Sequence, residues 1–93
     1  EVPYETAKSA VRLLELLPDL ARNGNANAVT DVGVAGLLAS AAAKGALFNV
    51  EINLNSLPPG EGEDIRQELP VLKEASRLYS RQVMDAVRDR MDS

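Results

Sequence analysis

The sequence contains no cysteine and no histidine, and only 3% of its residues are aromatic. The lack of cysteine excludes disulfide bonds and thiolate metal sites, so we expect no metal centre and a reducing, cytoplasmic compartment. The lack of histidine removes the side chain that most often transfers protons near neutral pH. Any proton transfer would therefore fall to a carboxylate or to a group on another chain.

Excess positive charge and long uncharged runs are also missing. The formal net charge is −4, whereas nucleic-acid-binding domains are usually basic, so we expect no nucleic-acid partner. The longest run without a charged residue, residues 32–43, is shorter than the ~20 residues of a membrane-spanning helix. The N-terminus lacks the basic and apolar segments of a signal peptide. We therefore expect no contact with a membrane.

What the 93 residues do contain is 45% hydrophobic side chains, chiefly Ala and Leu, which favour helices over strands. Polar positions recurring every three or four residues predict amphipathic helices over residues 3–22 and 62–91, around a third helix over residues 31–54. Pro18 should kink or split the first helix after Leu17. Asn23 or Gly24 should end this helix in a left-handed cap.

The middle segment has an unusual composition. Ten of the fourteen residues from 33 to 46 are Gly, Ala or Ser, and only Lys44 and Glu51 are charged between residues 32 and 59. This pattern is typical of a buried helix that neighbouring backbones approach closely. Two amphipathic helices would cover it only in part, so we expect further helices from a missing segment or a second chain. A short strand over residues 50–54 is a minor alternative.

Polar side chains gather in the loop before the middle helix, at Asn25, Asn27, Thr30 and Asp31. One interpretation is a ligand-binding turn, in which amides, backbone N–H groups and a carboxylate point at one spot. The other is a capping loop, with Thr30 or Asp31 as the N-cap of the helix. Capping is the commoner role of such residues.

A second polar group is the pair Asn49 and Asn53, one helical turn apart. The two amides could hydrogen-bond an amide-rich heterocycle or pair with neighbouring backbone groups. Asp31 and Asn49 lie eighteen residues apart, which is about five helical turns, or ~27 Å along the axis. One helix therefore cannot bring both to a single reacting centre. Lys73, Arg77 and Arg81 form a basic stripe, which we interpret as a solvated surface.

Three stretches resemble a known family. Residues 24–35 are similar to its pattern G-N-x-N-x-x-[ST]-D-x-G-V-A, and residues 48–54 to its N-V-x-I-N-L element; residues 2–7 resemble the opening of one of its helices. The family is that of formiminotetrahydrofolate cyclodeaminases and methenyltetrahydrofolate cyclohydrolases. The resemblance implies an all-α fold that commonly forms dimers, with a tetrahydrofolate derivative as substrate and no further cofactor.

The resemblance also implies site residues. It assigns a proton-handling role to Asp31 and substrate contacts to five others: Asn25, Asn27, Thr30, Asn49 and Asn53. The family domain is considerably longer than this chain. Residues 1–93 would therefore be the C-terminal part of one helical domain, inactive without its N-terminal half.

Two other hypotheses remain at this point. The chain could be a non-catalytic helical module that associates with itself through the small residues of its middle helix. It could also be a degenerate relative that binds folate without converting it.

Overall fold

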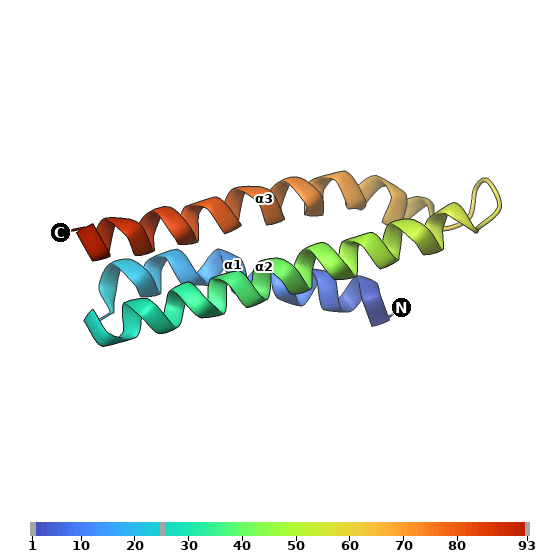
Figure 1. Cartoon of the computed structure of the whole chain (residues 1–93). Helices are drawn as coiled ribbons and strands as arrows, with labels where there is room; N and C mark the ends of the chain where they lie inside the picture. The colour runs from blue at the N-terminus through green and yellow to red at the C-terminus, as the bar shows by residue number, and fades with distance from the viewer. Residues whose placement is uncertain (1, 25, 93) are drawn as a thin grey trace.

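The structure, a computed structural model, describes residues 2–24 and 26–92, with only the backbone described at residues 26 and 27. The chain forms an elongated bundle of 52 × 17 × 14 Å (Figure 1). It consists of three helices that run alternately in opposite directions: α1 (Val2–Asn23), α2 (Ala26–Asn55) and α3 (Glu63–Asp92). This confirms the predicted all-α fold. Because α1 is shorter than its neighbours, the α2–α3 turn projects beyond the N-terminus of α1 (Figure 1).

Of the two outcomes predicted for Pro18, the split is wrong, because α1 is one continuous helix to Asn23, while the kink stays a prediction. Pro18 is buried, so packing outweighs the single backbone hydrogen bond that its missing N–H forfeits. The predicted left-handed cap is also wrong at Gly24. Its N–H still donates to the Leu20 carbonyl oxygen at 2.8 Å, and positive φ values among the described residues occur only at Gly60 and Gly62.

Gly24 is nevertheless needed at this turn. A Cβ atom there would lie 2.7 Å from the Leu20 oxygen, too close for any other residue without a shift of the chain. The turn between α2 and α3 uses glycine in the more familiar way, since Gly60 and Gly62 have φ values of 91° and 68°.

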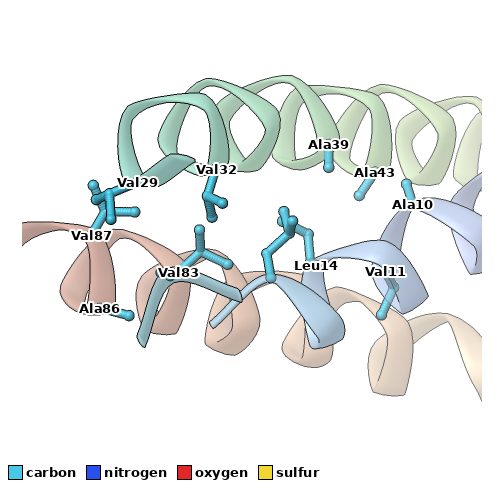
Figure 2. Close-up of a cluster of buried hydrophobic side chains, with 12 residues drawn as sticks. Ala10, Val11, Leu14, Val29, Val32, Ala39, Ala43, Val83, Ala86 and Val87 are labelled. Atoms are coloured by element: carbon cyan, nitrogen blue, oxygen red, sulfur yellow. The ribbon is translucent and has the colours of Figure 1, made fainter. Parts of the chain in front are cut away.

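Helix α2 begins several residues earlier than predicted, at Ala26. The added turn buries Val29 beside Val87 of α3, and this burial favours helix over the loop expected from the polar residues (Figure 2). The strand alternative for residues 50–54 is wrong, since they belong to α2, and Val50 and Leu54 are buried.

The core runs along the axis where the three helices meet. Leu14 and Val83 are fully buried in it, beside Val32 and Ala39 of α2 (Figure 2). Helix α2 approaches α3 closely through glycine: a Cβ at Gly36 would lie 2.6 Å from Val83 Cγ1. The predicted close approach of neighbouring backbones to the small-residue helix is therefore confirmed.

Two arginines of α3 close the ends of the other helices. The Nη1 group of Arg90 donates to three carbonyl oxygens at 2.7–3.0 Å, those of Ala21, Arg22 and Gly24. Arg66 donates from Nη2 to the Leu54 carbonyl oxygen at 2.8 Å. Each guanidinium therefore donates to carbonyl oxygens at or just beyond the C-terminal end of a neighbouring helix, where carbonyl groups lack the usual intrahelical donor.

The outer face of α2 is apolar and uncovered. Val34, Leu38 and Phe48 are 53%, 68% and 62% exposed. The prediction that α1 and α3 cover the middle helix only in part is therefore confirmed.

Helix α2 is also long and apolar enough, over Ala28–Asn55, to meet the length and composition of a membrane span, although none was expected. Of the most apolar stretch within it, 44% is buried in the bundle. The core helix of a bundle has the same composition, so this resemblance is weak grounds for a membrane location.

Candidate functional site

Four candidate site residues of α2 are exposed: Thr30, Asp31, Asn49 and Asn53. Thr30 and Asp31 fall in the second turn of the helix, so the prediction that either caps the helix is wrong. Both side chains are exposed at the end of the bundle where α1 turns into α2. Asn25 lies outside the described residues. Asn27 belongs to α2, but its side chain lies outside the described part of the structure.

Asn49 and Asn53 are both exposed on α2, near the opposite end of the bundle. The structure thus places the two predicted groups on one continuous helix. Eighteen residues of helix separate Asp31 from Asn49, ~27 Å at 1.5 Å per residue. Asp31 therefore cannot act on a group that is bound at Asn49 of the same chain.

Asn49 lines a groove between α2 and the first turns of α1. Its walls are Val2, Pro3 and Thr6 of α1 and Ala42, Ala46 and Asn49 of α2, and its volume is about 290 Å³. We call this depression the Asn49 groove. It brings two of the three family-like stretches together, the α1 opening and the Asn49 element, while residues 24–35 lie at the other end (Figure 1).

The sequence did not single out Thr6, which faces this groove from α1. The family-like opening at residues 2–7 pointed to it, but we interpreted that stretch only as a helix start. Asn53 is not among the residues that line the groove, since it lies one turn further along α2 than Asn49.

A polar contact fixes the α1 wall of the groove. The hydroxyl of Tyr4 donates a hydrogen bond to Glu68 of α3, and Lys8 Nζ lies 4.9 Å from the centre of the Tyr4 ring. This hydrogen bond to Glu68, with smaller contributions from burial and from the carboxylate charge, raises the pKa of Tyr4 from 10.0 to about 12. Tyr4 therefore stays protonated and keeps the first turn of α1 against α3.

None of the six residues that line the groove is titratable. The groove can bind and orient a ligand through the Asn49 amide and the Thr6 hydroxyl, but a proton must come from elsewhere.

The basic stripe behaves as expected of a solvated surface. Lys73 Nζ contacts Glu51 Oε1 at 3.1 Å, and Arg77 pairs with Glu74 one turn away. Among the described residues, no group of three or more Asp or Glu side chains could hold a metal ion.

The structure is thus an all-helical bundle with a mainly apolar surface groove that one amide and one hydroxyl side chain line. The family model described as formiminotransferase-cyclodeaminase matches residues 1–69, about three quarters of the chain. The chain belongs to this family. No curated protein and no solved structure matches it significantly.

Proposed function

We propose that this chain is the C-terminal part of a folate-dependent one-carbon enzyme. As a cyclodeaminase it would close 5-formiminotetrahydrofolate to 5,10-methenyltetrahydrofolate with release of ammonia. As a cyclohydrolase it would add water to 5,10-methenyltetrahydrofolate to give 10-formyltetrahydrofolate. Both reactions take place on the same folate scaffold and use no cofactor beyond it.

One observation carries this proposal. The family match over residues 1–69 spans all three family-like stretches, namely the α1 opening and the motifs that contain Asp31 and Asn49. The match therefore includes every stretch from which the proposed site residues are taken.

The proposed roles follow from the chemistry of the side chains. Asp31 is the proposed proton-handling group, since both reactions require proton transfer and the chain has no histidine. Asn49 and Asn53 are proposed contacts to the folate at one end of α2, and Asn25, Asn27 and Thr30 at the other.

The distance between Asp31 and Asn49 means that Asp31 cannot serve a ligand in the Asn49 groove of its own chain. We therefore propose that Asp31 acts in this groove from the second chain of a homodimer, or that an N-terminal half of the same domain supplies the carboxylate. The exposed apolar residues of α2, including Leu38 and Phe48, support such a covering partner. We place the assembled enzyme in the cytoplasm.

The same exposed face favours one rival function, a helical self-association module without catalysis. Its residues repeat at alternating steps of four and three, as in helix-pairing interfaces: Val34, Leu38, Ala41, Gly45, Phe48 and Ile52. A third function lies between the enzyme and the self-association module, namely that of a relative that binds folate without converting it.

The test follows the absorbance of 5,10-methenyltetrahydrofolate with this chain alone and with the longest protein that its gene encodes. Formation from the 5-formimino substrate identifies a cyclodeaminase, and decay to the 10-formyl product identifies a cyclohydrolase. Asn49→Ala and Asp31→Ala should reduce turnover and leave the helical circular dichroism unchanged, because both side chains are exposed.

If no form of the protein turns over or binds either folate, the catalytic proposal is refuted. A loss of self-association in Leu38→Asp, measured by sedimentation in the same preparations, would then support the self-association module.

A further inference from the structure

We propose that the Asn49 groove binds the pterin ring of the folate, and that Thr6 is a second specificity-determining residue, opposite Asn49. This inference rests on the proposed function and adds to it the part of the substrate that this site holds.

The size of the groove selects a fragment of the substrate. At about 290 Å³ the groove is at the lower limit of small-molecule sites, which span about 300–1,000 Å³. It has room for one flat bicyclic ring, and a whole folate would extend beyond it. Ala42 and Ala46 form the α2 side with the smallest side chains that still present an apolar surface, which suits the face of a planar ring.

The polar groups of the groove indicate which ring of the folate it binds. The Asn49 amide and the Thr6 hydroxyl can each donate and accept a hydrogen bond, and the other four lining residues are apolar. The edge of a pterin alternates N–H donors with nitrogen and oxygen acceptors, so it complements this pair. The benzoyl ring of folate has no such edge. The glutamate tail is anionic, and no cation is among the described residues that line the groove.

The groove wall is held in place before a ligand arrives. Pro3 fixes its own φ angle in the first turn of α1, and the hydrogen bond from Tyr4 to Glu68 anchors the same turn to α3. A wall that is already ordered loses little conformational entropy on binding, which favours recognition by only two hydrogen-bonding side chains.

The test compares variants with the protein in its longest encoded form. Thr6→Val removes the hydroxyl and keeps the shape of the side chain, and Ala42→Leu fills the groove from an exposed position of α2. Ser9→Ala is the matched control, because Ser9 is an exposed hydroxyl on the next turn of α1 and does not line the groove. The probes are 6-methyltetrahydropterin, which has no benzoylglutamate tail, and the whole folate substrate.

Binding of each probe is measured by titration calorimetry, and turnover by KM and kcat separately. We expect Thr6→Val to weaken binding of both probes about fivefold, the usual effect of one neutral hydrogen bond, and to raise KM. Ala42→Leu should abolish binding of the pterin probe, and Ser9→Ala should change neither value.

The inference and the proposed function can fail separately. If the folate is turned over but Thr6→Val and Ala42→Leu behave like Ser9→Ala, the groove assignment is refuted, while the proposed enzymatic function is retained. If the pterin probe binds with the expected variant effects but no folate is converted, the groove assignment stands and the catalytic proposal falls. If wild-type protein binds neither probe, both are refuted.

Discussion

Replacing Gly36 by alanine tests how closely α2 and α3 approach. The new Cβ atom would lie 2.6 Å from Val83 Cγ1 and 3.5 Å from Val83 Cβ. Carbon atoms pack best at about 3.5–4.0 Å. Val83 is fully buried, so its side chain has no open space into which to turn. The two helices must therefore move apart or Val83 must leave its preferred rotamer.

The matched control is Gly45→Ala in the same helix, where an added Cβ atom would meet nothing within 4 Å. Both substitutions gain about 1 kcal/mol from the higher helix propensity of alanine. Only Gly36→Ala also has the cost of overpacking, about 1–3 kcal/mol. We therefore expect the free energy of unfolding of Gly45→Ala to exceed that of the wild-type chain by about 1 kcal/mol. That of Gly36→Ala should be about 1–3 kcal/mol lower than that of Gly45→Ala.

The free energy of unfolding is obtained from urea titrations followed by circular dichroism at 222 nm, with both variants and the wild-type chain under one condition. The difference between the two variants is the decisive quantity, because the propensity term cancels in it. Equal stabilisation of Gly36→Ala and Gly45→Ala would refute the close contact between Gly36 and Val83, and with it this packing of α2 on α3.

Three further predictions concern contacts of α3. Arg90→Leu should lower the free energy of unfolding by about 1.5–3 kcal/mol in urea titrations, because three carbonyl oxygens lose a charged donor. Ser76→Ala should raise the free energy of unfolding by about 1 kcal/mol, because the buried Ser76 hydroxyl has no hydrogen-bond partner among the described residues. In wild type, the contribution of the Tyr4 hydrogen bond to the free energy of unfolding should be lost between pH 10 and about pH 12, and Tyr4→Phe should lack this contribution. The measurement is the free energy of unfolding of both proteins against pH.

The sign of the pH effect follows from the raised pKa of Tyr4. The folded state holds the proton more tightly than the unfolded state, so the contribution is complete below pH 10 and is lost as the pH approaches 12. Tyr79→Phe serves as its control and should leave this loss in place. A wild-type curve parallel to that of Tyr4→Phe would contradict the hydrogen bond to Glu68.

The other two predictions also have matched controls. Arg22→Leu removes an exposed ion pair with Asp19 and should cost less than Arg90→Leu. Ser80→Ala removes a hydroxyl that donates to Ser40 at 2.8 Å, so it should destabilise where Ser76→Ala stabilises. Equal effects within either pair would contradict the corresponding contact.

The two outer helices were predictable because their periodicity is strong, and the middle helix because its small, uncharged residues are typical of a buried helix. Local features were misjudged, as two examples show. Thr30 and Asp31 have the composition of an N-cap, but burial of Val29 extends the helix past them. Pro18 has the character of a helix breaker, but its place in the core keeps α1 continuous. In both cases a tertiary contact, which a local pattern does not contain, outweighed a preference of about 1–3 kcal/mol.

The candidate site was predictable only in its parts. The motif spacing identified Asn49, and the rise of an α-helix was enough to set its separation from Asp31. The groove itself depends on how far α1 and α2 slide past each other, since this offset decides that Thr6 and Val2 lie beside Asn49. The offset depends on the turn after Asn23 and on the packing of the core. The sequence pattern locates the turn and the buried faces, but it does not give the offset between the helices.

The family match ends at residue 69, within α3, yet the rest of that helix is indispensable to the fold. Val83 and Val87 fill the space against Gly36 and Gly33 of α2, and Arg90 closes the end of α1. Without residues 70–92, the half of α2 that carries Asp31 would lose its contacts with α3. The matched segment alone would therefore lose part of the packing that positions the Asp31 motif, because the second half of α3 completes the bundle around this part of α2.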